Sequence, residues 1–88
     1  MTKVKEQTLP KWFKGELYEE GDTVKNRFSG EEYKLTGAEL SMYDFIIGSQ
    51  LVMEMMPHTI MPQQIKDFQK GLDWFRSHNA KAYMVLLD

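Results

Sequence analysis

The sequence has no cysteine and no long apolar run. Without cysteine the chain can form no disulfide, no thiolate metal site and no cysteine nucleophile. Its most apolar stretch, around residues 46–56, is interrupted by polar residues and is shorter than the roughly 20 residues that span a bilayer. Residues 1–8 are polar, so we expect no signal peptide there. These absences predict a cytoplasmic protein that does not bind membranes.

An excess of charge of either sign is also missing. The chain has 11 Lys and Arg against 13 Asp and Glu, a formal net charge of −2, and its basic residues form no run. Nucleic-acid binding is therefore not expected, since it usually needs clustered cations. The 42% hydrophobic content argues against disorder, and 88 residues suffice for one domain. We expect a flexible tail over residues 1–8 and a single small soluble domain over residues 9–88.

A β-hairpin is predicted near the start of that domain, over about residues 23–35. Tyr33 and Leu35 are two residues apart, which is the spacing of side chains on one face of a strand. Ser29 and Gly30 precede them and are typical turn residues. A two-stranded hairpin is marginally stable alone, so it must pack on other elements.

Three helices are predicted after the hairpin. Thr36 followed by Glu39 is a capping box, which begins a helix over about 37–56 that Pro57 ends. Pro62 suits the first position of a second helix over about 62–78, with a one-sided apolar seam. Residues 80–87 fit a short helix capped by Asn79, with a strand as the alternative. The expected fold is α+β and mainly helical, with the hairpin packed on two main antiparallel helices and the short C-terminal helix.

Trp12 and Phe13 follow Pro10 in the segment before the hairpin. We interpret the pair as an apolar plug that docks on the domain. The alternative is an exposed aromatic pair that binds a partner.

No catalytic constellation is visible. Phosphate-binding loops, metalloprotease histidine pairs and nucleophile elbows are missing. His58 and His78 can share a role only if the fold joins their segments, and Asp44 and Glu54 are about 15 Å apart along a helix. We therefore expect no enzyme and no cofactor.

The first helix is apolar almost all round, with a narrow polar strip at Ser41, Asp44 and Gly48. Such a helix is buried on most sides, either inside its own fold or against another chain. We therefore expect a protein-protein interaction or self-assembly function, with the chain itself or another protein as partner. The candidate interface is the stripe Leu40, Tyr43, Ile47, Leu51 and Met55.

Four methionines and one histidine lie between Met53 and Met61. Thioether and imidazole groups suit Cu(I), so this segment is an alternative soft-metal or small-ligand site. Methionine also fills gaps where helices turn and makes adaptable binding surfaces. Packing or recognition is the favoured interpretation.

Residues 21–31 (GDTVKNRFSGE), 40–46 (LSMYDFI) and 69–75 (QKGLDWF) resemble small uncharacterised proteins of tailed phages that infect marine bacteria, including cyanobacteria. The resemblance extends over about residues 12–88. It implies a location in the cytoplasm of an infected host and, for a partner other than the chain itself, a host or viral protein. It supplies no activity or site residue.

Overall fold

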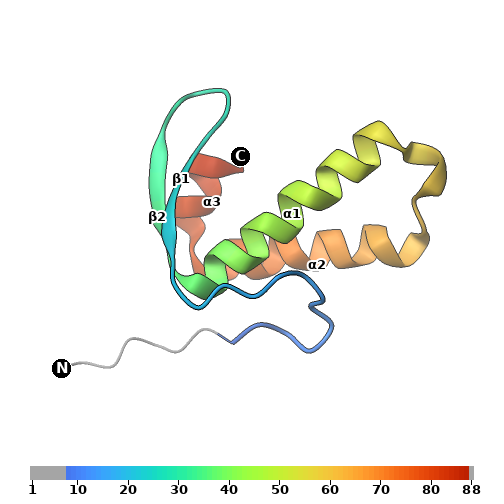
Figure 1. Cartoon of the computed structure of the whole chain (residues 1–88), viewed down its shortest axis with the longest axis horizontal. Helices are drawn as coiled ribbons and strands as arrows, with labels where there is room; N and C mark the ends of the chain where they lie inside the picture. The colour runs from blue at the N-terminus through green and yellow to red at the C-terminus, as the bar shows by residue number, and fades with distance from the viewer. Residues whose placement is uncertain (1–7, 88) are drawn as a thin grey trace.

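The chain folds as a two-stranded hairpin followed by three helices, which is the α+β, mainly helical fold expected (Figure 1). The computed structural model describes residues 8–87. The predicted tail, residues 1–8, therefore lies outside the described residues except for Thr8. Among residues 8–87, no helix is long and apolar enough to cross a bilayer.

The hairpin pairs β1 (Asp22–Lys25) with β2 (Glu32–Leu35) in antiparallel register, so that Val24 lies opposite Tyr33. Gly30 turns the connecting loop with a φ of +80°, a conformation that only glycine adopts without strain. Leu35 is fully buried at the end of β2. The hairpin predicted over residues 23–35 is confirmed.

The capping box at the start of α1 (Gly37–Met55) is also confirmed. The Glu39 N–H donates to Thr36 Oγ1 at 3.2 Å, and the Thr36 N–H donates to Glu39 Oε1 at 2.9 Å. The helix ends one residue before the predicted end, because Pro57 opens a short 3-10 turn, η1 (Pro57–Thr59).

Helix α2 (Pro62–His78) has the predicted bounds, and α3 (Ala80–Leu86) is a helix rather than a strand. Asn79 separates them: its N–H donates to Phe75 O at 2.9 Å, and its Oδ1 accepts from the Ala82 N–H at 3.1 Å. One residue thus ends α2 and caps α3.

Helices α1 and α2 run antiparallel, and α3 turns back behind the hairpin (Figure 1). Strand β2 packs chiefly on α3 and less on α1, so the hairpin is supported by the short helix more than by the two long ones. The core lies where β2, α1, α2 and α3 meet. Its buried apolar members are Leu35, Met42, Ile46, Phe75, Ala82 and Leu86.

The segment before the hairpin crosses α1 as the predicted plug. The ring centroid of Phe45 lies 5.8 Å from Trp12 and 5.6 Å from Phe13. Both aromatic residues are half-buried against the core, so the interpretation as an internal plug is confirmed.

Candidate functional site

The predicted interface stripe on α1 divides into two parts. Leu40, Tyr43 and Ile47 are half-buried within the fold, whereas Leu51 is exposed and Met55 is 75% exposed. The inner three contribute mainly to packing inside the molecule. The outer two lie where α1 leaves the core.

Tyr43 shows how the inner part is used. Its ring centroid lies 6.2 Å from that of the buried Phe75. Tyr43 and Ile47 also line a hollow of about 140 Å³ beneath the hairpin loop, which includes Phe28. Burial raises the pKa of Tyr43 above its ordinary value, and the nearby Arg27 partly opposes this shift.

The largest group of exposed apolar side chains lies where η1 connects the antiparallel helices α1 and α2, at the end of this helix pair away from the β-hairpin. We call this surface the apolar end: Leu51, Met55, Met56, Met61 and Ile65. The sequence places Ile65 in the apolar seam of α2, but Ile65 is exposed because the two helices diverge toward η1 (Figure 1).

The close approach of α1 and α2 near the core has a local cause. Gly71 is buried, and a Cβ atom there would lie only 3.2 Å from Met42 Sδ. The missing side chain lets the helices approach closely at this level. Beyond it the helices diverge (Figure 1), and a groove lies between them.

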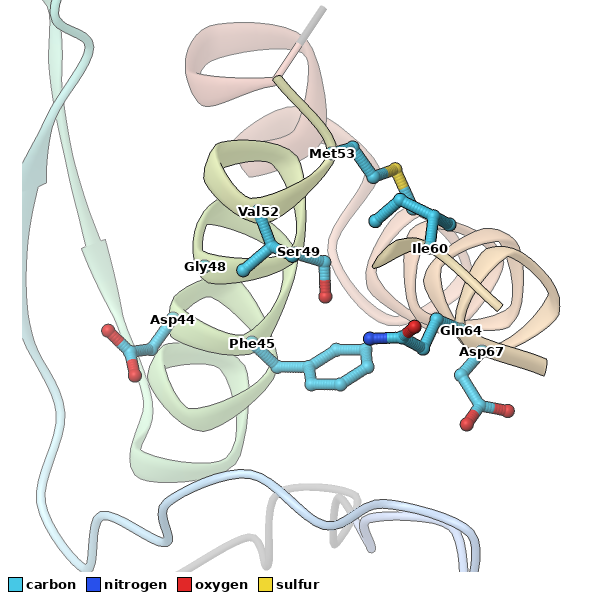
Figure 2. Close-up of a pocket in the computed structure, with 9 residues that line it drawn as sticks. All are labelled: Asp44, Phe45, Gly48, Ser49, Val52, Met53, Ile60, Gln64 and Asp67. Atoms are coloured by element: carbon cyan, nitrogen blue, oxygen red, sulfur yellow. The ribbon is translucent and has the colours of Figure 1, made fainter. Parts of the chain in front are cut away.

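The groove between α1 and α2 has a volume of about 400 Å³ and mostly apolar walls (Figure 2). This volume lies within the range of about 300–1,000 Å³ that is usual for binding pockets. The residues that line it are Asp44, Phe45, Gly48, Ser49, Val52, Met53, Ile60, Gln64 and Asp67.

The charged residues of the groove are both acidic. Asp44 lies on α1 with its side chain directed away from α2, and Asp67 lies on the α2 edge (Figure 2). Neither forms an ion pair with another of residues 8–87, but Asp44 is hydrogen-bonded by Tyr18, and Gln63 Nε2 donates to Asp67 Oδ1 at 2.8 Å. Burial, followed by the carboxylate of Asp44, raises the pKa of Tyr18 above its ordinary value.

The fold does not bring the two histidines together. His58 lies in η1 and His78 at the opposite end of α2, so the length of that helix separates them. His78 stacks on Trp74 with ring centroids 4.0 Å apart, and its Nδ1 lies 2.7 Å from Trp74 O. Within residues 8–87, no group of three His, Asp or Glu side chains is placed to hold a metal ion.

The methionine-rich segment has two environments. Met53 is half-buried and lines the groove, where its side chain lies beside Ile60 (Figure 2). Met55, Met56 and Met61 are exposed at the apolar end, as is His58. The predicted recognition segment is therefore at the surface.

The polar strip predicted on α1 is only partly at the surface. Asp44 and Gly48 are exposed, but Ser41 is buried. Its Oγ donates to Gly37 O at 2.8 Å and accepts from the Tyr18 N–H at 2.9 Å. The prediction from residue types did not include the segment around Tyr18, which covers Ser41.

The fold and these surfaces define a small α+β chain with an exposed apolar end and an acidic-edged apolar groove. Comparisons of the chain with protein-family models, with curated proteins and with solved structures found no match. The phage relationship and the cytoplasmic location therefore remain predictions.

Proposed function

We propose that the chain is a non-enzymatic self-assembly protein, and that the apolar end of one copy contacts the apolar end of a second copy. The observation that carries this proposal is the exposure of five large apolar side chains at the end of α1, in the connection and at the start of α2: Leu51, Met55, Met56, Met61 and Ile65. Burying such a patch releases about 25 cal/mol for each Å² of apolar surface removed from water.

The charges of this region suit a contact between identical surfaces. Residues 51–66 contain one acid, Glu54, and one lysine, Lys66. Both are exposed, and neither makes an ion pair with another residue of the described range. In a two-fold contact each surface meets its own copy, so Glu54 of one copy can approach Lys66 of the other without like-charge repulsion.

Substitution of the apolar end tests this function. Met55→Gln with Met61→Gln keeps side-chain length and adds no charge while removing apolar surface from two residues that are 75% and 63% exposed. We expect the dimer dissociation constant, measured by analytical ultracentrifugation, to rise about tenfold or more.

Met84→Gln is the matched control, because Met84 is similarly exposed but lies on α3. It should leave the dissociation constant unchanged. A chain that dimerises equally well with and without Met55 and Met61 would contradict the two-fold contact. A chain that stays monomeric at every concentration would point instead to a host or viral partner.

Soft-metal binding is the second candidate, because Met55, Met56, Met61 and His58 are all exposed on one turn. Thioether and imidazole ligands would hold Cu(I) there. The expected result is one Cu(I) bound per chain in anaerobic titration, lost when His58 is replaced by Phe. No binding above that of the Met55→Gln, Met61→Gln variant would exclude this candidate.

A further inference from the structure

The β-hairpin leaves one edge of each strand without a neighbouring strand. Within residues 8–87 the sheet consists of β1 and β2 alone. A two-stranded sheet is marginally stable, and its free edges present unpaired backbone N–H and C=O groups to any strand that can reach them. The two edges of this hairpin differ in how far those groups are already used.

The outward backbone groups of β2 belong to Glu32 and Lys34. The Asn26 N–H donates to Glu31 O at 2.8 Å, so these two residues form a hydrogen-bonded pair at the end of the hairpin. In an antiparallel sheet such pairs alternate with pairs that exchange no hydrogen bond. The register therefore turns the N–H and C=O groups of Glu32 and Lys34 away from β1.

The outer edge of β1 is less available than that of β2. By the same alternation the Thr23 N–H points outward from β1, and Asp22 Oδ1 accepts from it at 2.7 Å. A carboxylate thus occupies the position that a further strand would need. Among the described residues no side chain accepts from the outward N–H groups of Glu32 and Lys34.

The side chains of β2 divide between the two faces of the hairpin. Tyr33 and Leu35 pack against the core, whereas Glu32 and Lys34 are exposed on the opposite face, because side chains alternate along a strand. Neither of the two charged residues makes an ion pair with another of residues 8–87. All three helices lie to one side of the hairpin (Figure 1), so this charged face is open.

Strand β2 is complementary to itself in one antiparallel register. When Tyr33 of two copies lie opposite each other, Glu32 of each copy lies opposite Lys34 of the other. These two pairs have opposite charges, and their outward backbone groups can exchange hydrogen bonds. A shift of the register by one residue in either direction would centre the pairing on Glu32 or Lys34 and bring like charges together. Parallel pairing in register would do the same.

We propose that the outer edge of β2 binds the same edge of a second copy, so that the two hairpins form one antiparallel sheet. This edge contact pairs Glu32 with Lys34 of the second copy, and Tyr33 with its own counterpart as an aromatic cross-strand pair. The inference goes beyond the proposed function, because the edge contact uses none of the residues of the apolar end.

Reversing one charge at a time provides the test. Every chain also carries Met55→Gln and Met61→Gln, so that the apolar end contributes little. In this background we expect a dimer that gains population with concentration. Glu32→Lys and Lys34→Glu should each raise its dissociation constant about tenfold or more, since like charges then face each other in both pairs. Analytical ultracentrifugation measures the change.

A mixture of the two variants distinguishes the register from a general effect of charge. Between a Glu32→Lys chain and a Lys34→Glu chain both pairs have opposite charges again, so the mixture should form 1:1 dimers about as tightly as the background chain. Lys14→Glu is the control, because Lys14 is exposed and lies outside the hairpin, and it should leave the dissociation constant unchanged. A mixture no tighter than either variant alone would overturn the edge contact, as would a background chain that is monomeric at every concentration.

Amide hydrogen exchange tests the backbone pairing without any change to the hairpin. In the background chain the N–H groups of Glu32 and Lys34 should exchange more slowly where the dimer dominates than where the monomer dominates, and that of Lys25 on β1 should not change. Equal exchange at both concentrations would also overturn the edge contact. The apolar end is tested separately by the Met55 and Met61 substitutions, so either contact can fail alone.

Discussion

Glu39 joins the first turns of two helices through a buried carboxylate. It is 3% exposed, and its Oε2 accepts from Asn79 Nδ2 at 3.1 Å while its Oε1 accepts from the Thr36 N–H. Asn79 in turn caps α3 through the Ala82 N–H. The side chains of Glu39 and Asn79 thereby connect the start of α1 with the start of α3, 40 positions later in the chain.

Replacing Asn79 by Ala should lower the free energy of unfolding by about 2 kcal/mol. The substitution removes a helix cap worth about 1 kcal/mol and leaves the buried Glu39 with one partner fewer. Urea denaturation measures the change. Ser77→Ala is the control, because its exposed hydroxyl donates only to Asp73 O, and it should cost less than about 0.5 kcal/mol.

At the residue scale, the sequence predicts the local contacts better than the distant ones. The Thr36–Glu39 capping box spans three residues and follows from their types alone. The burial of Ser41 depends on Tyr18, 23 residues earlier, and no local pattern signals it. The exposure of Phe28 was also not predicted, because an aromatic residue beside a strand usually packs inward.

The two long helices are defined by signals at their ends, which is why their bounds are predictable. Prolines stand at positions 57 and 62, and Asn79 follows α2. The groove is different, because it depends on how α1 and α2 diverge from the close approach at Gly71. Packing between the helices sets that divergence, and the hydrophobic periodicity of neither helix sequence indicates it.

Gly48 provides a prediction at the scale of the helix. It lies in the middle of α1, is exposed, and has open space where a Cβ atom would be. Gly48→Ala should therefore raise the free energy of unfolding by about 0.5–1 kcal/mol, because alanine loses less backbone entropy in a helix.

The matched substitution is Gly37→Ala at the start of the same helix. A Cβ atom there would lie 2.5 Å from Tyr18 O, so the segment before the hairpin would have to move. Gly37→Ala should therefore destabilise the protein. Thermal denaturation of both variants checks the pair, and stabilisation by Gly37→Ala would contradict the packing of residues 18 and 37.

At the scale of the whole molecule, the apolar end, the groove and the exposed Phe28 loop are three separate surfaces. The apolar end lies at one extreme of the α1–α2 hairpin, and the exposed Phe28 loop lies on the other side of α1 from the groove. The proposed two-fold contact uses the first of these surfaces. The sequence predicts an excess of apolar surface on α1, but only the fold divides that excess between the core, the apolar end and the groove.

Native mass spectrometry of the unmodified chain over a range of concentrations tests self-assembly most directly. We predict a dimer of the 10.4 kDa chain that gains population with concentration. A bare monomer at every concentration would contradict the central claim.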